Sequence, residues 1–402
     1  MYLFRINTKN LFLLLLIIAM PCYVSCKGKT TKNENHLNDN IKEHVNEEYS
    51  TNDDAHFTDV PVTYHYIFKG KIDGKYAFSM SLTVDSTSVS GQYQYANSKD
   101  YGMSLSGSIQ NNDIKLEETL YIPEKQKSET TGFFEGKFYP AEGKVSGTWF
   151  SANRGKSYPF EMNNYYGVNY PQFSFKSDIQ GDDIDKTLNT LVIYDKNGKI
   201  QTIENIGAKP TYNGLIMQDF NFDGYLDIAL MEMLGMRFTP YIYFAYNPNN
   251  KQFEKMELSG DIDSKSFDYE NKIMTSGWYY GSDRYGNSSY KYNNGKFYEI
   301  SSLQHEENDD TGEYTETTTN YKIINGESVV DSEAITESRL IENTTNEFRT
   351  ITIYYKIIDN EKIEDKKLIE ETRLKKGSTE EYIKTRTWYK KAGDEWVNET
   401  EE

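Results

Sequence analysis

Alternating apolar and polar residues dominate the chain from Tyr64 to about Tyr166, in runs such as "YAFSMSLTV", "GMSLSGSI" and "IKLEETLYI". Gly, Asn, Asp and Ser separate the runs, and these residues favour tight turns. Because successive side chains of a strand point to opposite faces, this period of two predicts half-buried antiparallel strands joined by hairpins. We therefore expect residues 58–166 to form an antiparallel meander, either a barrel or a curled sheet.

A second pattern repeats strand-turn-strand segments over residues 167–402, and it begins with two apolar runs that flank Asn197-Gly198, a strong hairpin signal. From about residue 313 the segments recur every 34 residues, at Glu313, Glu347 and Glu381 and at Tyr321, Tyr355 and Tyr389. A fixed period indicates one unit stacked on its neighbours, which predicts a propeller-like repeat domain. The period is shorter than the roughly 40 to 45 residues of a standard blade, so smaller blades and an extended hairpin array are both open. Together the two patterns predict an all-β protein.

The N-terminus carries an apolar run from Leu11 to Met20 after two basic residues. The run is too short to cross a bilayer core of about 30 Å, so it predicts a secretory signal peptide over residues 1–25. "YVSC" resembles a bacterial lipobox, and we expect Cys26 to become the lipidated first residue, as by palmitate. Cys22, at the end of "AMPC", is the weaker alternative.

Residues 26–57 are polar and almost free of large apolar side chains, a composition typical of a disordered tether. No Asp follows Cys26, which favours a lipid anchor in the outer membrane. Cys22 and Cys26 are the only cysteines, so a disulfide framework is excluded. Three of the five histidines lie in the tether, leaving His65 and His305 for the rest of the chain. A histidine-dependent active site is therefore poorly supported.

The negative charge of the chain limits the classes of molecule that it is expected to bind. The formal net charge is −18, and residues 301–402 hold 25 acidic against 14 basic residues. Such a surface repels nucleic acid and anionic lipid. The natural electrostatic complement is a basic protein, although a merely solvated acidic surface is the simpler interpretation.

The segment "DFNFDGYLDIAL" has the spacing of a calcium loop. Gly224 stands at the sixth position, where such a loop turns sharply. The predicted ligands occupy positions one, three, five, seven and nine, and they are Asp219, Asn221, Asp223, Tyr225 and Asp227. Tyr225 would contribute its backbone carbonyl. Hard oxygen donors favour Ca²⁺ over zinc or copper, so Ca²⁺ is the predicted cofactor.

The motif departs from the helix-loop-helix pattern because the twelfth position is Leu230 rather than Glu. We therefore expect a calcium loop that leads into a strand, with Asp227 as the closing carboxylate. The alternative is an Asx-rich turn that binds no ion. No base or nucleophile stands beside the motif, as a catalytic metal would require. A structural ion is the better interpretation.

The segments "QDFNFDGYLDIALM", "PYIYFAYNPNNKQFEKMELSG" and "GWYYGSDRYGNSSYKYNNGKFYEI" resemble bacterial lipoproteins with calcium loops and propeller-like folds, a family that includes immunity proteins against peptidoglycan-cleaving effectors. The resemblance covers about residues 185–300. It implies a calcium ion bound at the five positions named above and a binding role rather than catalysis. The runs over residues 58–166 also loosely resemble a β-rich N-terminal module of bacterial surface lipoproteins.

The sequence leads to three hypotheses about function. The first is a non-enzymatic, calcium-stabilised envelope lipoprotein that binds a protein, such as a basic peptidoglycan hydrolase that it inhibits. The second is a surface lipoprotein that binds, or less plausibly cleaves, glycans, with Tyr and Trp rings as platforms for sugars. The third is a structural envelope component.

Overall fold

The computed structural model describes residues 57–96, 102–179, 187–209, 214–232, 240–256, 265–281, 283–293, 295–359, 361–376, 378 and 381–399. The predicted signal peptide, Cys26 and the tether up to His56 lie outside these residues. Regular structure in the described residues consists of β-strands and two short 3-10 turns, which confirms the all-β class. The described part of the chain contains no helix with the length and apolarity that a membrane crossing requires.

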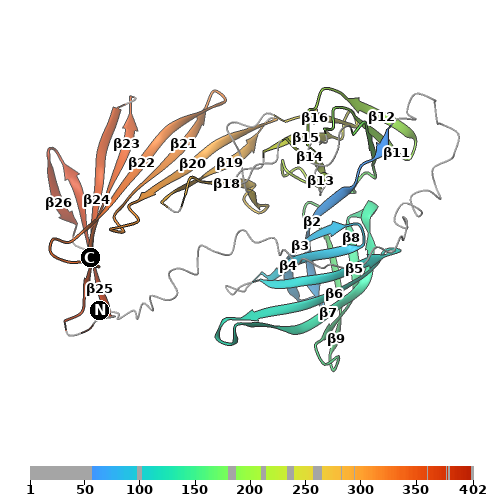
Figure 1. The fold of residues 1–402 in the computed structure, drawn as a ribbon, viewed down its shortest axis with the longest axis horizontal. Coiled ribbons are helices and arrows are strands. Elements are labelled where there is room, and N and C mark those ends of the chain that lie inside the picture. The colour runs from blue at the N-terminus through green and yellow to red at the C-terminus, as the bar shows by residue number, and fades with distance from the viewer. Residues whose placement is uncertain are drawn as a thin grey trace. The chain divides into compact units, whose positions relative to one another are not determined.

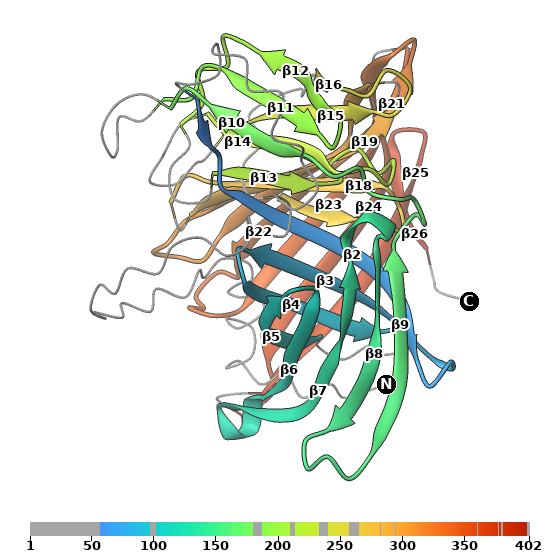
Figure 2. The ribbon, with the colours of Figure 1, turned by 90° about the vertical axis from the view of Figure 1, so that its right-hand side faces the viewer.

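Eight strands form a closed antiparallel barrel, as the alternating pattern predicts (Figure 2). Each strand pairs with the next in the chain, and the barrel closes where Phe68–Ile72 pairs with Phe160–Asn164. Alternate apolar side chains, such as Phe68 and Phe134, fill the interior. The strands are β2 (Val62–Ile72), β3 (Tyr76–Asp85), β4 (Ser88–Tyr95), β5 (Met103–Gln110), β6 (Asp113–Ile122), β7 (Lys127–Tyr139), β8 (Lys144–Ser151) and β9 (Ser157–Asn164).

Strands β7 and β8 of the barrel approach each other closely where Gly136 lies directly opposite Gly147. A Cβ atom on Gly147 would stand only 2.5 Å from the Cα atom of Gly136. Glycine is required here because any side chain would push the two backbones apart.

Strand β2 pairs with strands of the barrel and, beyond the barrel, with a further strand of the same sheet. Beyond the barrel, Val62–Tyr64 pairs in parallel with Leu215–Met217 of β13 (Leu215–Gln218). The sheet continues through β14 (Asp227–Met231), β15 (Tyr241–Asn247) and β16 (Gln252–Lys255). A second, four-stranded sheet contains β1 (Thr58–Asp59), β10 (Ser174–Ser177), β11 (Leu191–Asp195) and β12 (Gly198–Ile203), and its β11–β12 hairpin turns at Asn197-Gly198 as predicted.

These strands share one apolar core, which runs from the barrel interior to residues such as Leu191, Leu215 and Ile228. The compact unit around this core extends to Ile273 and includes Tyr292–Phe297. The segment with the predicted calcium loop is therefore packed on the same core as the barrel.

The 34-residue repeats lie in the third sheet, whose ten strands follow one another in chain order (Figure 1). Of the two arrangements left open by the short period, the described strands form the extended hairpin array. They lie in one sheet rather than in separate blades, so the term propeller-like applies only loosely. The strands are β17 (Lys265–Asp268), β18 (Ile273–Tyr279), β19 (Arg284–Asn293), β20 (Lys296–Glu307), β21 (Tyr314–Ile324), β22 (Glu327–Leu340), β23 (Phe348–Ile358), β24 (Glu361–Leu374), β25 (Tyr382–Ala392) and β26 (Glu395–Glu399).

The repeat strands have almost no apolar core of their own. Among the described residues from 314 to 399, Leu368 is the only buried hydrophobic side chain. Contacts between neighbouring strands replace a core, for example the stacked rings of Tyr354 and Trp388, with centroids 5.7 Å apart. Such cross-strand pairs and the backbone ladder hold the hairpins together.

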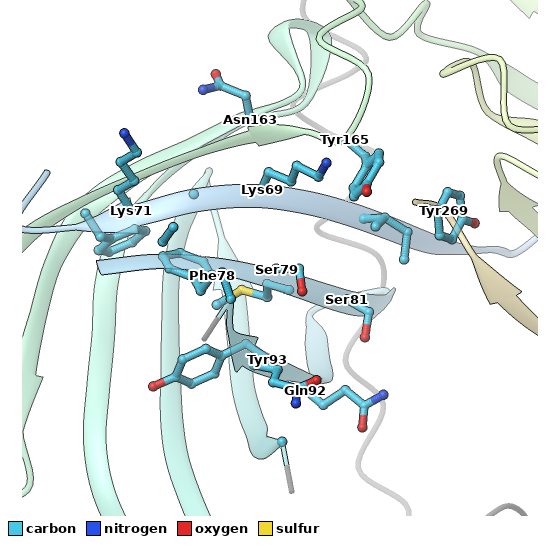
Figure 3. A pocket seen from close by; sticks show the side chains of 18 of the residues that line it. Lys69, Lys71, Phe78, Ser79, Ser81, Gln92, Tyr93, Asn163, Tyr165 and Tyr269 are labelled. Carbon is cyan, nitrogen blue, oxygen red and sulfur yellow. The ribbon is translucent and has the colours of Figure 1, made fainter. Parts of the chain in front are cut away.

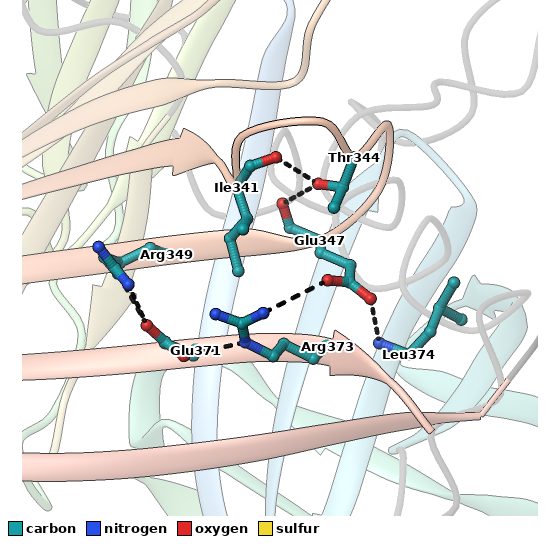
Figure 4. Close-up of polar contacts among 7 residues, drawn as sticks. All are labelled: Ile341, Thr344, Glu347, Arg349, Glu371, Arg373 and Leu374. Atoms are coloured by element: carbon teal, nitrogen blue, oxygen red, sulfur yellow. Dashed lines mark hydrogen bonds and ion pairs between the residues drawn. The ribbon is translucent and has the colours of Figure 1, made fainter. Parts of the chain in front are cut away.

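One hydrogen bond recurs at the same place in two successive hairpins, and Figure 4 shows the bond that Glu347 makes. The Glu347 carboxylate accepts a hydrogen bond from the backbone N–H of Leu374 at 3.0 Å. One period earlier, Glu313 accepts the equivalent bond from Leu340 at 2.9 Å. Each glutamate precedes the first strand of one hairpin and accepts a hydrogen bond from the end of that hairpin's second strand, so the bond closes both hairpins at the same length.

We expect Glu347→Ala to lower the free energy of unfolding of the repeat sheet by about 1 kcal/mol, the typical net value of one hydrogen bond. Chemical denaturation followed by circular dichroism measures the change. Glu342→Ala, at an exposed position of the preceding loop, is the control and should leave stability within error. Equal effects of the two variants would show that the Glu347 bond contributes nothing specific.

Candidate metal centre

The predicted calcium loop is the connection of a β-hairpin. Strand β13 ends at Gln218 and β14 begins at Asp227, and these two residues pair across the ladder. Asp219, Asn221 and Asp227 are buried, whereas Asp223 is exposed. The predicted form, a polar loop that leads into a buried strand, agrees with this hairpin.

Backbone amides of the loop donate to its own side chains. Asp219 accepts hydrogen bonds from the N–H groups of Asp223 at 3.1 Å and Gly224 at 2.9 Å. Gly224 has a φ of 95°, which favours glycine at this turn. Asn221 donates through its side-chain amide to the Asp223 carboxylate at 3.1 Å. The polar side chains therefore determine the shape of the loop.

Asp227 connects the loop to the sheet. Its carboxylate is fully buried and accepts bonds from the backbone N–H groups of Phe220 at 2.9 Å and Asn221 at 3.3 Å. Its other oxygen accepts the N–H of Tyr246 in β15 at 2.9 Å. Both oxygens of Asp227 thus hold backbone in place, which is an architectural role.

Burial, and for Asp219 and Asp227 also neighbouring negative charge, destabilises the charged forms of the three carboxylates. Burial, and next the charge of Asp223, raises the pKa of Asp219 to about 7. Burial, followed by the charges of Asp219 and Asp223, also raises the pKa of Asp227 well above its usual value. Partial desolvation raises the pKa of Asp223, although hydrogen bonds from Tyr225 and Asn221 and the charge of Lys272 act in the opposite direction. The Lys272 ammonium donates to the Phe222 carbonyl at 3.0 Å. Protonation or a bound cation would each stabilise this arrangement of carboxylates.

The donor set fits Ca²⁺ in chemistry, because it consists of carboxylate, amide and carbonyl oxygens. Asp219, Asn221, Asp223 and Asp227 are joined by one hydrogen-bond network, and Tyr225 joins it by donating its N–H to Asp223 at 2.8 Å. In the described part of the chain, however, no group of three or more His, Cys, Asp or Glu side chains is drawn together in the geometry of a metal site.

Residues far away in sequence complete the surroundings of the loop. The Tyr269 hydroxyl donates to the backbone carbonyl of Asp219 at 2.9 Å and accepts from the Gln218 amide at 2.9 Å. The Tyr166 hydroxyl donates to the carbonyl of Tyr269 at 2.8 Å. Nothing in the spacing of the motif indicates Tyr166 or Tyr269, since both come from other segments.

A groove of about 1300 Å³ lies on the outer wall of the barrel, beside the turn that follows β17 (Figure 3). Its polar lining comes from outward-facing positions of the strands, including Ser79, Gln92 and Asn163. The Lys69 ammonium lies 3.6 Å from the centre of the Tyr165 ring. The groove therefore presents amide and hydroxyl groups next to an aromatic ring and a cation.

The barrel contains a buried carboxylate, Glu118, that the sequence alone did not identify. The alternating pattern indicates only that this position of β6 faces inward. Glu118 is 2% exposed and lies at an irregularity in the pairing of β6 with β7. It accepts bonds from the Tyr93 hydroxyl at 2.5 Å, the Trp149 indole N–H at 2.9 Å and the Thr131 hydroxyl at 2.5 Å. A charge this deeply buried requires such donors.

Four aromatic residues of the barrel strands, Tyr93, Tyr95, Phe133 and Trp149, are of the kind that can line a ligand cavity, but they make other contacts. Tyr93 and Trp149 donate to Glu118, and the Tyr95 ring packs edge-on against Tyr93 with centroids 5.5 Å apart. Phe133 faces Arg154, whose guanidinium carbon lies 5.0 Å from its ring centre. These contacts agree with packing inside and on the wall of the barrel.

Comparisons with known proteins add little. No family model and no curated protein matches the chain. A type IV secretion system related protein from Xanthomonas covers 50% of this chain and 99% of its own length, at 13% identity and a TM-score of 0.30. A Bacteroides fragilis protein, provisionally named a 6-phosphogluconolactonase, covers 75% of this chain and 93% of its own, at 10% identity and a TM-score of 0.19. Scores this low support no conclusion about this chain.

We expect Tyr93→Phe to lower the free energy of unfolding by about 1 to 3 kcal/mol, because the buried Glu118 carboxylate loses one of its three donors. Thermal melting measures the loss. Tyr121→Phe removes a hydroxyl from a side chain that is 53% exposed and serves as the control. An unchanged melting temperature in Tyr93→Phe would contradict the role of the Tyr93 bond.

Calcium removal should destabilise the fold in a pH-dependent way. Because the folded pKa of Asp219 is raised to about 7, its contribution without calcium favours the fold at low pH and is lost as pH rises through about 7. In chelator, the melting temperature should therefore fall between pH 5 and pH 8. At pH 8, Ca²⁺ at about a hundred times its Kd should restore about 2.7 kcal/mol.

Asp219→Asn should remove both the calcium effect and this part of the pH dependence, whereas Asp113→Asn, at an exposed pair with Lys137, should retain them. Identical melting curves in Ca²⁺ and in chelator at pH 8 would exclude a structural calcium ion.

Proposed function

We propose that the protein is a calcium-stabilised lipoprotein of the outer membrane that binds a protein partner, as an immunity-type inhibitor of a cell-wall hydrolase. The observation that carries the calcium part is the loop between β13 and β14. Burial raises the pKa of Asp219 and of Asp227, and the charge of Asp223 raises both further; a divalent cation would stabilise the charged forms of these carboxylates.

The proposed role of Ca²⁺ is structural, and we propose no enzymatic activity. A catalytic ion needs an open coordination position beside a base or a nucleophile. Asp227 instead accepts three backbone N–H groups and thereby connects the loop to β15. An ion at the loop would stabilise the hairpin that joins β13 to β14.

Attachment to the membrane rests on the N-terminal sequence. The signal peptide over residues 1–25 and lipidation of Cys26 would place the folded chain at the outer membrane, joined to it by the polar tether. A lipid anchor of this kind is compatible with a folded chain of antiparallel sheets outside the bilayer.

The charge of the repeat sheet supports a basic partner. Residues 301–402 carry 25 acidic and 14 basic residues, and complementary charge accelerates encounter between proteins. Cell-wall hydrolases are often basic, so a hydrolase fits this surface better than a nucleic acid does.

Glycan binding is the second candidate, and the groove on the barrel favours it. Ser79, Gln92 and Asn163 supply hydroxyl and amide groups that suit sugar hydroxyls, and Tyr165 supplies a ring at the same groove. The two candidates use different surfaces, so variants of the groove separate them.

A pull-down from the secreted proteins of the producing cell tests the first candidate. We expect the immobilised full-length chain to retain a basic cell-wall hydrolase in Ca²⁺, to retain less in chelator at pH 8, and to inhibit the retained enzyme. Gln92→Ala should leave this retention unchanged. Retention of polysaccharide alone, lost in Gln92→Ala, would favour the groove and contradict the inhibitor proposal.

A further inference from the structure

Four rings from consecutive strands form a ladder across one face of the repeat sheet. Tyr279 of β18 lies 6.0 Å from Tyr285 of β19, measured between ring centroids. Tyr285 stacks on His305 of β20 at 4.5 Å, and His305 stacks on Tyr314 of β21 at 5.0 Å. We call these four residues the aromatic ladder. It begins at an exposed side chain, since Tyr279 is 57% exposed.

His305 is the unusual member of the aromatic ladder. It is only 6% exposed, and neither ring nitrogen has a hydrogen-bond partner. Its Nε2 lies 3.5 Å from the Glu307 carboxylate and its Nδ1 lies 3.5 Å from the Glu316 carboxylate. Buried polar atoms without hydrogen bonds are rare and require a reason. The imidazole thus lies beside two carboxylates, neither of which forms a hydrogen bond with it.

These two carboxylates differ from others in the same sheet. Glu370 is paired with Lys384 and Arg386, whereas none of the described Lys and Arg side chains forms an ion pair with Glu307 or Glu316. Both remain accessible, with side chains 41% and 32% exposed. Negative charge on this face is therefore not neutralised within the described chain.

The ring geometry distinguishes between two kinds of ligand. Sugars bind to the faces of aromatic rings, but the faces in the aromatic ladder are largely occupied by neighbouring rings. The planes of Tyr285 and His305 differ by 19°, and those of His305 and Tyr314 by 28°. The ladder consequently presents ring edges, the exposed Tyr279 and two carboxylates. Exposed tyrosines are typical energetic centres of protein interfaces, and carboxylates pair with Lys and Arg.

The geometry points to the aromatic ladder, with Glu307 and Glu316, as the docking surface for a basic protein whose Lys or Arg side chains pair with these two carboxylates. The inference rests on the proposed protein-binding function and names its surface. It does not depend on the calcium loop, which belongs to the other compact unit of the chain.

The test uses the full-length chain with two basic probes, lysozyme as a peptidoglycan hydrolase and cytochrome c as a basic protein with no action on cell walls. Calorimetry at low salt measures Kd. We expect Glu307→Gln/Glu316→Gln to weaken lysozyme binding at least tenfold and Tyr279→Ala to weaken it at least threefold. Carbodiimide coupling, read by mass spectrometry, should join probe lysines to Glu307 and Glu316.

The matched control is Glu306→Gln/Glu337→Gln, which removes the same charge from the opposite face of the same strands and should change Kd less than twofold. In the register, Glu306 and Glu337 both lie opposite Thr315, whereas Glu316 faces the other way. If the two double variants weakened binding equally, binding would depend on the net negative charge rather than on Glu307 and Glu316, and the inference would be overturned. Failure of both probes to bind would also overturn it.

Binding of soluble peptidoglycan fragments that is lost in Tyr279→Ala would also overturn the inference, because it would make the ladder a glycan site. Coupling of both probes at Glu307 and Glu316 without inhibition of lysozyme would support the surface while contradicting the inhibitor function. A melting temperature unaffected by chelator would remove only the calcium proposal.

Discussion

Backbone pairing between strands that follow one another in the chain is the constraint on which the described structure depends. The barrel, the hairpins β13–β14 and β15–β16, and the ten-stranded sheet are all built in this way. Their antiparallel ladders need only short turns. The main exception is the parallel pairing of β2 with β13, which connects the barrel to the loop containing Asp219 and Asp227. This pairing helps to bring the candidate metal centre onto the core that the barrel strands share.

The acidic side chains have three different kinds of surroundings. Glu118 receives three side-chain donors inside the barrel. Asp227 receives backbone N–H groups, but the nearby carboxylates of Asp219 and Asp223 still raise its pKa. At the repeat sheet, Glu307 and Glu316 face a histidine at a distance too long for a hydrogen bond. The donors around Glu118 leave no need for a further partner. We propose that the loop with Asp227 binds a cation and that Glu307 and Glu316 bind basic side chains of a partner.

The two compact units suit different tasks. The unit with the barrel has a continuous apolar core, which can hold a site in fixed geometry. The repeat strands have a single buried hydrophobic residue among those described, Leu368, so both faces of the hairpins are available for contacts. Glutamates such as Glu347 keep successive hairpins equal in length. A regular, charged sheet of this kind is consistent with the proposed docking of a basic protein.

The sequence by itself determined what depends on near neighbours in the chain. The period of two predicted the barrel strands, the Asn197-Gly198 turn predicted a hairpin, and the 34-residue period predicted repeated units. The polar loop after Gln218 was also predictable, because the hydrogen bonds that shape it internally join residues no more than seven positions apart. Only the tertiary structure decided which distant segments meet: Tyr269 against Asp219, Tyr93 and Trp149 against Glu118, and Tyr285 and Tyr314 on either side of His305. It also decided that the repeats extend one sheet, since a repeat length fixes the unit but not the angle at which the next unit is added.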